Sequence, residues 1–393
     1  MPNAPQSAHA FMPYPEASVP NATTGTLAGL SFGVKDLFDI AGYPTSGGQP
    51  FLLAMSGIKA RTAPTVRRLL DAGARFAGKT ITDELAFSMS GKNVHFGAPV
   101  NGAAPQRITG GSSSGSAAAV SNRLCDFALG TDTGGSVRAP ANHCGLVGLR
   151  PTHGRLSLMR VLDLSPSFDT CGWFSRDVGT FARVADVLLG ADPTPLPDPV
   201  RLLEPTDVWG LLAPAVQDAL AEPRARVQAV LGAAAPVQAA FESFDAMYWH
   251  FRCLQGREAW QTHGAMIERF APPLGAIVAT RMEWARTVTD AQVAAGADFR
   301  LHFRARLAAL LGVDGVLLMP TMPDIAPEVG ADEASLEDYR NKATWMLCIA
   351  GLAGFPQLSL PLGTRLGAPL GFSLLGPPGS DRSLVRLAER IAV

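Results

Sequence analysis

Residues 110–136 read GGSSSGSAAAVSNRLCDFALGTDTGGS, and these 27 residues hold six glycines and six serines. Glycine is favoured where the backbone turns through positive φ or approaches another atom closely, and serine where a hydroxyl reacts or caps. The small residues form two loops. Between them we expect a short helix with Ser116 as its N-cap, then a strand over 125–129. Because loops at one end of a sheet form the ligand sites of α/β proteins, the stretch predicts an α/β fold with a reaction centre here.

The overall composition is that of an ordinary globular protein. Of 393 residues, 47% are hydrophobic and 17% are charged, which is enough material for a large core in one domain or two. The 33 Lys and Arg nearly balance the 34 Asp and Glu, so no net field favours nucleic acid or an anionic membrane as a partner. A small neutral molecule is therefore the expected ligand.

The sequence carries no clear targeting or metal-binding signal. Its first residues lack the positive start and apolar run of a signal peptide, and no stretch is apolar for the roughly 18 residues of a membrane span. We therefore expect a cytoplasmic protein without membrane association. The five cysteines are scattered without metal-ligand spacing, so we expect free buried thiols and neither a metal nor a cofactor.

The order of the patterns predicts a single domain with α/β character at both ends. We expect an N-terminal arm over 1–27, the core with both loops over 28–190, a mostly helical insertion over 191–312, and the rest of the core over 313–393. The proline-rich segment 193–205 is expected to be a linker or surface crossing. Helical periodicity marks four segments of the insertion: 213–230, 241–270, 274–288 and 290–311.

A lysine interrupts an apolar segment near the start of the chain. Residues 30–40 (LSFGVKDLFDI) indicate a buried strand, in which Lys35 is either a snorkelling edge residue or a functional one. Residues 73–80 (GARFAGKT) match the phosphate-loop pattern, with Lys79 as its lysine. However, we expect a helix before this match and a strand inside it, whereas a phosphate loop needs a strand before and a helix after. We therefore discount nucleotide binding.

Three serines are candidates for a nucleophile. Residues 111–115 (GSSSG) match the GxSxG elbow of α/β-hydrolases with Ser113, but the residues before them are polar and turn-like instead of a strong strand. Ser56 and Lys59 match the SxxK pattern of serine β-lactamases without the other motifs of those enzymes. Ser136 is better placed, because an apolar strand leads into the loop GTDTGGS that carries it.

The loop before Ser136 suits the stabilisation of an oxyanion. With Gly134 and Gly135 in succession, the backbone can curl so that the N–H groups from Thr133 to Ser136 point at one spot. A serine hydroxyl also needs a base, and no histidine sits in a telling pattern. A lysine desolvated in apolar surroundings can be neutral near pH 7 and accept a proton, so Lys35 is the candidate base.

These segments together resemble the amidase signature family. Residues 32–36 (FGVKD), 110–115 (GGSSSG) and 130–141 (GTDTGGSVRAPA) follow the order and spacing of the family, and the similarity continues over 148–154. The resemblance implies a large mixed β-sheet with helices on both faces and a helical insertion. It also implies hydrolysis of an amide through an acyl-enzyme, without a metal or a cofactor.

The resemblance also implies roles for individual residues. Ser136 corresponds to the nucleophile, Ser112 to the bridging serine of a Ser-cis-Ser-Lys triad, and Lys35 to the base. In such enzymes the peptide bond that matches Gly111–Ser112 is cis. The positions that match residues bracing the two loops by hydrogen bonds are Ser113, Asp132 and Arg138.

Within the family, the sequence is most similar to the plant-type indole-3-acetamide amidohydrolases. The shared features are the loop 91–97, the triple serine of the first loop and the segment 167–174 (SFDTCGWF). On this basis we expect His95, Phe96 and Cys171 to line the substrate pocket.

We expect the substrate to be a small primary amide, converted to its acid and ammonia. The alternatives are the glutaminase-type subunit of a tRNA-dependent amidotransferase, which uses the same triad, and a non-catalytic binding protein. The chain departs from the family at Gly351, where many members carry Asn. Two points stay open: whether Trp249, Trp260, Trp284 and Phe270 line the acyl pocket or fill helix cores, and whether the protein forms a homodimer.

Overall fold

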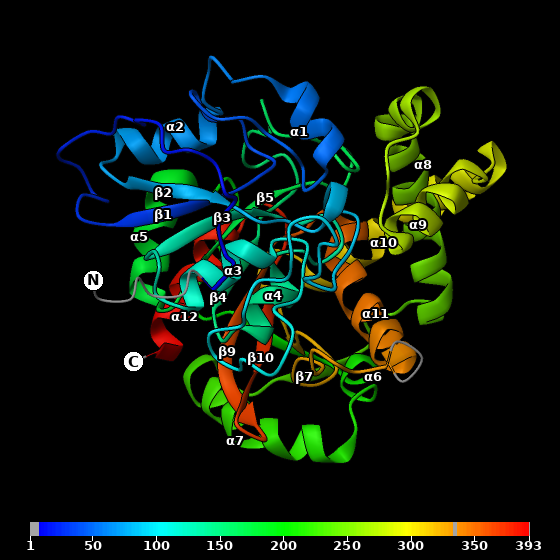
Figure 1. Cartoon of the computed structure of the whole chain (residues 1–393). Helices are drawn as coiled ribbons and strands as arrows, with labels where there is room; N and C mark the ends of the chain where they lie inside the picture. Colours follow the sequence, from blue (N-terminus) through cyan, green and yellow to red (C-terminus); the bar gives the residue numbers. More distant parts are fainter. Residues whose placement is uncertain (1–7, 333–335, 393) are drawn as a thin grey trace.

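The computed structural model describes residues 8–332 and 336–392. In this part of the chain, ten strands form one sheet in the order β2-β1-β3-β5-β4-β9-β10-β8-β6-β7 (Figure 1). The strands are β1 Ser31–Lys35, β2 Arg75–Thr80, β3 Phe127–Thr131, β4 Val147–Arg150, β5 Cys171–Ser175, β6 Arg201–Pro205, β7 Ala235–Val237, β8 Gly315–Pro320, β9 Gln357–Arg365 and β10 Ala368–Leu375.

The sheet is mixed, and its strand directions determine where the two loops end. β1 lies between β2 and β3 and is parallel to both, while β6 is parallel to β7 and β8 at the other edge. The central strands from β3 to β8 pair antiparallel. Because β1 and β3 run in the same direction, the side chains at their carboxyl ends, Lys35 and Thr131, reach the same edge of the sheet.

Helices cover both faces of the sheet. The described helices are α1 Pro50–Ser56, α2 Pro64–Asp71, α3 Ser114–Ser121, α4 Arg138–His143, α5 Val178–Leu188, α6 Thr206–Trp209, α7 Pro214–Leu231, α8 Phe244–Phe270, α9 Ala276–Arg286, α10 Asp290–Leu311, α11 Glu337–Ala353 and α12 Asp381–Ala392, with a short 3₁₀ helix over Glu84–Ala86. In Figure 1, α3 and α4 lie in front of the central strands, while α8, α9 and α10 project to one side.

The alternation of side chains along β3 shows how one strand serves two cores. Phe127 and Leu129 belong to the large core on one face, which also contains the apolar side chains of α2, α5 and α12. Ala128 belongs to a smaller core on the other face, with the alanines of α3 and Ala141 of α4. Successive residues of a strand point to opposite faces, so a strand that is apolar throughout needs cover on both sides.

The long helices of the insertion agree closely with the sequence pattern. α8 begins after Ser243, whose hydroxyl accepts from the amide of Ala246, and α10 begins after Thr289, which forms a capping box with Gln292. The bounds predicted for α7 and α9 also lie within a few residues of those observed. In these segments the local signals of apolar spacing and capping are sufficient.

Two local predictions are wrong. Ser116 is not an N-cap: α3 starts at Ser114, and the Ser116 hydroxyl lies inside the helix and donates to the carbonyl of Leu129 (2.8 Å). The segment 193–205 is not merely a linker, because its end forms β6, which pairs with β8. Both errors have one cause, since neighbouring strands supply partners that the local sequence does not reveal.

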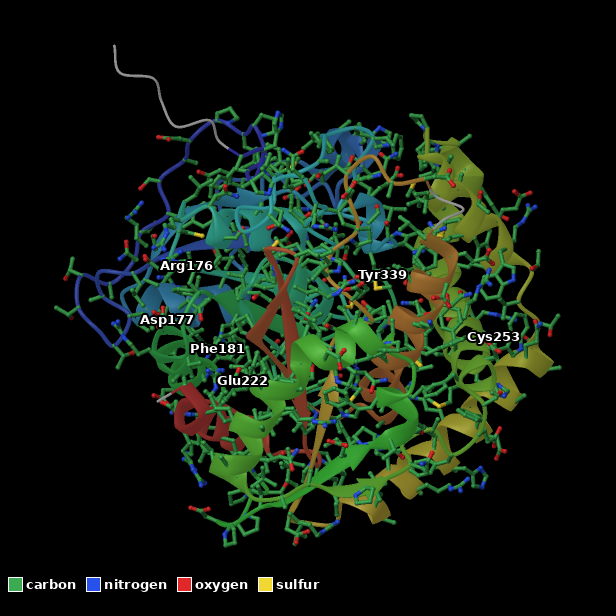
Figure 2. The ribbon with its side chains drawn as sticks, turned by 90° about the horizontal axis from the view of Figure 1, so that it is seen from below. Arg176, Asp177, Phe181, Glu222, Cys253 and Tyr339 are labelled. Carbon is green, nitrogen blue, oxygen red and sulfur yellow. The ribbon has the colours of Figure 1, made fainter. Side chains whose placement is uncertain are left out.

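The free thiols agree with the sequence-based expectation. All five cysteines are unpaired and buried, and Figure 2 shows Cys253 on α8. In the described residues, no helix is long and apolar enough to cross a membrane.

Candidate active site

Lys35 occupies the last position of β1 and is completely buried. Its Nζ lies 2.7 Å from Ser112 Oγ and 2.8 Å from Thr131 Oγ1 and donates to both. Burial disfavours the ammonium form and lowers the pKa of Lys35 to about 7, against the opposing effect of nearby carboxylates. A substantial fraction of Lys35 is therefore neutral at neutral pH, and a neutral amine can accept a proton from the hydroxyl beside it.

The peptide that presents Ser112 is held in place by the segment 82–91. The bond between Gly111 and Ser112 is cis. The Gly111 amide donates to the carbonyl of Met89 (3.0 Å), and the Ser112 carbonyl accepts from the Asp83 amide and the Thr82 hydroxyl (both 3.0 Å). These bonds aim the Ser112 hydroxyl at Lys35.

Ser136 lies in the turn between β3 and α4, beside the first loop. The Ser113 amide donates to the Ser136 carbonyl (3.3 Å), which joins the two loops. The Ser113 hydroxyl does not face the cavity, because it donates to the carbonyl of Thr131 (3.2 Å) and lies against Gly130, where a Cβ would come within 2.7 Å. Ser136 itself is 4% exposed and lines a cavity, so its hydroxyl is accessible to a small molecule.

Asp132 is the centre of the second loop. Its carboxylate accepts from the amides of Gly135, Val137 and Arg138 and forms ion pairs with the guanidinium groups of Arg138 (2.8 Å) and Arg150 (3.1 Å). Burial by itself would raise the pKa of Asp132, but the two guanidinium groups and the amide donors hold it well below its usual range. The carboxylate therefore stays ionised and fixes the loop that carries Ser136.

The amides around Ser136 are not all equivalent. The Gly135 amide is used by Asp132 (2.9 Å), whereas those of Thr133, Gly134 and Ser136 donate to no atom of the described residues. The Thr133 hydroxyl donates to Asp169 (2.5 Å). Gly135 has φ +122°, and a Cβ there would come within 2.5 Å of Leu347, so this turn requires glycine.

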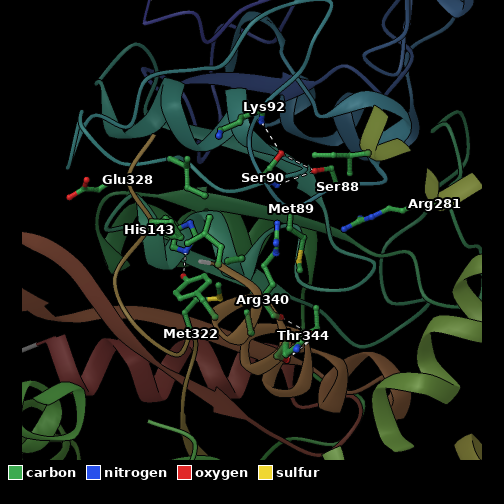
Figure 3. Close-up of a pocket in the computed structure, with 18 of the residues that line it drawn as sticks. Ser88, Met89, Ser90, Lys92, His143, Arg281, Met322, Glu328, Arg340 and Thr344 are labelled. Atoms are coloured by element: carbon green, nitrogen blue, oxygen red, sulfur yellow. Dashed lines mark hydrogen bonds between the residues drawn. The ribbon is translucent and has the colours of Figure 1, made fainter. Parts of the chain in front are cut away.

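The cavity at Ser136 shares five lining residues with a larger cavity. The larger cavity, of about 270 Å³, is mostly apolar and contains the hydrogen-bonded pair of His143 and Tyr339 (2.7 Å; Figure 3). The residues that line both cavities are Ser88, Met89, Tyr248, Arg281 and Thr344. In the described residues, no group of three His, Cys, Asp or Glu is arranged to hold a metal ion.

The chain matches a family of known proteins. The family model described as Amidase matches residues 4–209 and 220–385. The chain belongs to the amidase family. It is 37% identical to Amidase 1 of Arabidopsis thaliana, with 93% of both chains covered, and 39% identical to Amidase 1 of Oryza sativa subsp. japonica, with 93% of this chain and 90% of the relative covered.

A solved amidase structure and a second type of relative complete the comparison. The crystal structure of an amidase superposes with a TM-score of 0.84 at 30% identity and covers 93% of this chain and 85% of the other. A glutamyl-tRNA(Gln) amidotransferase subunit of Methanothermobacter thermautotrophicus is 32% identical over 94% of this chain and 85% of its own length. The enzyme is therefore an amidohydrolase with the amidase fold predicted from the sequence.

The three residues expected to line the substrate pocket of this amidase lie elsewhere. Cys171 is the first residue of β5 and is packed in the large core, where burial raises the pKa of its thiol to about 12. His95 Nε2 contacts the buried carboxylate of Glu84 (2.9 Å). Neither of these nor Phe96 is among the residues that line the cavity at Ser136. The direction of each of these side chains depends on packing, which the resemblance does not specify.

The aromatic residues left open by the sequence line neither cavity. Trp249 is 43% exposed and packs edge-on against Trp284, which also carries the guanidinium of Arg252 over its ring. Phe270 is 46% exposed. The aromatic residues of α8 that do line the cavity at Ser136 are Tyr248 and Phe251.

Phe251 also gives a reason for the departure at Gly351. A Cβ at Gly351 would lie 3.2 Å from the Phe251 ring and 3.5 Å from the Thr133 carbonyl. The ring therefore occupies the space toward which a larger side chain at position 351 would extend. The absent side chain and the Phe251 ring together determine the shape of this wall of the cavity.

Sequence reasoning missed four residues that contact the triad or its loops. Thr131 contacts Lys35, Asp169 accepts from Thr133, and Arg150 donates to Asp132 and to the Thr133 carbonyl. Asp83 donates its amide to Ser112. A signal existed for Arg150, since a charged residue ends an otherwise apolar strand, VGLR. Thr131 ends the apolar strand β3, and Asp83 and Asp169 lie in polar segments. Sequence alone does not distinguish these three short polar residues from others like them.

Proposed function

We propose that the protein hydrolyses the C–N bond of a small primary amide to a carboxylic acid and ammonia, through an acyl-enzyme on Ser136. The observation that supports this most directly is the contact between Lys35 Nζ and Ser112 Oγ (2.7 Å), next to the loop that carries Ser136. A buried lysine of lowered pKa in contact with a serine is the arrangement that proton transfer from a hydroxyl requires.

The proposed reaction uses a proton relay. Neutral Lys35 accepts the Ser112 proton while Ser112 accepts the proton of Ser136, and the Ser136 oxygen attacks the carbonyl carbon of the amide. The free amides of Thr133, Gly134 and Ser136 stabilise the resulting oxyanion, whereas the Gly135 amide stays with Asp132. The relay then protonates the nitrogen, the C–N bond breaks and ammonia leaves. Water attacks the acyl-enzyme by the same route and releases the acid.

We further propose an amide with an apolar, aromatic acyl group, such as indole-3-acetamide. Ammonia as the leaving group needs little room, so the larger cavity is available to the acyl part. Its lining is mostly apolar, with Ile108, Met322 and the ring of Tyr339 among its residues, which suits an aromatic ring. The relatives named Amidase 1 are compatible with this choice.

The test of this function is ammonia release by the wild type and by Ser136→Ala. A panel of indole-3-acetamide, phenylacetamide, propionamide and glutamine covers the substrate classes. We expect Ser136→Ala to lose at least about 10³-fold in kcat while circular dichroism stays unchanged, because the substitution removes the attacking hydroxyl. The exposed Ser157→Ala is the matched control and keeps full activity. Turnover by Ser136→Ala at the wild-type rate contradicts the assignment.

A second candidate is a glutaminase-type subunit that supplies ammonia to a partner. It is favoured by the similarity to the amidotransferase subunit over nearly the whole chain. In this case glutamine is the preferred amide of the panel, and its hydrolysis depends on a partner protein. Efficient turnover of aryl acetamides by the purified chain alone excludes this candidate.

We also propose a cytoplasmic location and a single domain built from all four segments of the chain. Fractionation of cells that express the tagged protein tests the location. Sedimentation of the purified protein shows whether it is a monomer or a homodimer.

A further inference from the structure

Asp83 is a buried carboxylate beside the triad to which the proposed relay gives no role. It follows β2, is completely buried and belongs to the segment that holds the Ser112 peptide. Its backbone amide donates to the Ser112 carbonyl (3.0 Å). Its side chain accepts from the amide of Gly91 (3.0 Å) through Oδ2, while Oδ1 has no hydrogen-bond partner among the described residues. The Ser88 and Ser114 hydroxyls lie near this carboxylate, but no cation of the described residues is paired with it. A buried carboxylate without a paired cation is costly, which suggests a function.

The Asp83 side chain is packed directly against the peptide that carries Ser112. A Cβ built on Gly111 would lie 2.3 Å from Asp83 Oδ2 and 2.6 Å from Oδ1. Only glycine leaves room for the carboxylate at this place. The amide and the side chain of Asp83 therefore approach the Gly111–Ser112 unit from the same segment and fix its position relative to Lys35.

Asp83 is also the carboxylate that acts most strongly on Lys35. Three carboxylates favour its ammonium form, with Asp83 first, then Asp169 and Asp132. Asp132 is compensated by two guanidinium groups, and Asp169 accepts from the Thr133 hydroxyl and two backbone amides. Asp83 forms no ion pair within 4.0 Å among the described residues.

The other charged side chains near Asp83 and Lys35 have hydrogen-bond or ion-pair partners of their own. Asp36, next to Lys35, pairs with Lys79 of β2 (2.8 Å). Glu84, next to Asp83, contacts His95 and accepts from the amide of Gly275. The negative charge of Asp83 favours the charged form of Arg281 in α9, but the Arg281 guanidinium donates its hydrogen bond to the Phe87 carbonyl (2.7 Å). In the described part of the chain, no paired cation neutralises the charge of Asp83, so this charge can stabilise the ammonium form of Lys35.

We propose that Asp83 is a positioning residue of the relay, which holds the Gly111–Ser112 peptide against Lys35 and whose negative charge sets how readily Lys35 gives up its proton. This inference rests on the proposed function, since it needs Lys35 to act as a base. Burial raises the pKa of Asp83 to about 6, against the opposing effects of the Gly91 amide, of Lys35 and of the nearby Ser88 and Ser114 hydroxyls. Its charge is thus present at neutral pH and is lost in the mildly acidic range.

The sign of the effect on Lys35 follows directly. The Asp83 anion stabilises the ammonium form and so raises the pKa of Lys35. Replacing the carboxylate by an amide removes this stabilisation, so Lys35 stays neutral to lower pH. A residue that merely held the loop would lower kcat at every pH and leave the shape of the pH profile unchanged.

The experiment is the pH profile of kcat/KM for the wild type, Asp83→Asn and Asp83→Glu with one amide substrate. We expect the acid limb of Asp83→Asn to move to lower pH by roughly one unit. Asp83→Glu keeps the charge, so its limb stays within a few tenths of a unit of the wild type while kcat falls. Asp126→Asn, at the opposite end of β3, is the matched control and leaves the limb in place.

The outcomes separate this inference from the proposed function. An unmoved limb in Asp83→Asn, or a limb that moves to higher pH, overturns the role of Asp83 even if Ser136→Ala is inactive. Activity of Ser136→Ala instead overturns the proposed function itself. If Asp83→Asn does not fold, Asp83→Ser, which removes the charge with a smaller side chain, gives the same comparison.

Discussion

At the scale of single residues, the chemistry depends on one lysine removed from water. The Lys35 amine donates to two hydroxyl groups. One belongs to Ser112 of the first loop and the other to Thr131 at the end of β3. Full burial makes the ammonium form costly and brings the pKa of Lys35 to about 7. An exposed lysine would be protonated at this pH and could only donate.

This gives a prediction for the pH dependence of the reaction. Lys35 acts in its neutral form, so activity is full above about pH 7 and falls as the pH drops through that value. Lys35→Met keeps the apolar stem and removes the amine, and we expect kcat to fall by about 10²–10⁴-fold. The measurement is the rate of ammonia release between pH 5 and 9, in buffers of constant ionic strength. A profile with no acid limb contradicts the role of Lys35.

At the scale of elements, the conformation of the turn between β3 and α4 is fixed by the carboxylate of Asp132. The Asp132 carboxylate accepts hydrogen bonds from three backbone amides and pairs with two guanidinium groups. These interactions hold the backbone of the turn in a curled conformation, in which other amides of the turn have no partner among the described residues. Arg150 reaches this turn from β4, and Arg138 from the first residue of α4. The turn is thus fixed by the sheet and by a helix together.

We predict that Asp132→Asn destabilises the fold by about 3–5 kcal/mol, because it leaves Arg138 and Arg150 buried without a compensating charge. The pKa of Asp132 is lower in the folded protein than in the unfolded chain. Its contribution is therefore present above about pH 4 and is lost as the pH falls below that value. Urea unfolding of both proteins at pH 7 and pH 3 measures the difference. Equal stability at pH 7 contradicts this account.

At the scale of the whole molecule, one sheet ties the insertion to the core. β6 and β7 come from the segment expected to be an insertion, yet β6 pairs with β8 in the same sheet as β1 and β3. The large core is likewise continuous. It includes the stacked rings of Trp173 and Phe181, whose centroids lie 4.7 Å apart (Phe181 is labelled in Figure 2).

We therefore predict that the chain unfolds as one unit. We expect calorimetry to show a single transition. Trp173→Ala is expected to lower the free energy of unfolding by about 3–5 kcal/mol and to move this whole transition to lower temperature. Phe270→Ala, which removes a half-exposed ring, is the control and has a smaller effect. Two separate transitions, of which Trp173→Ala moves one, would show that the insertion is an independent domain.

The sequence by itself determined the elements whose signals are local. The two Gly/Ser loops, the lysine inside an apolar strand and the periodic helices α8 and α10 follow from residue type and spacing, because backbone freedom and amphipathic faces are set within a few residues. Only the tertiary structure decided which side chains meet. It brought the Asp83 carboxylate against Gly111 across 28 positions of the sequence, turned Cys171 into the core and joined β6 to the main sheet. Such contacts depend on strand order and register, which long-range packing sets and which no local pattern encodes.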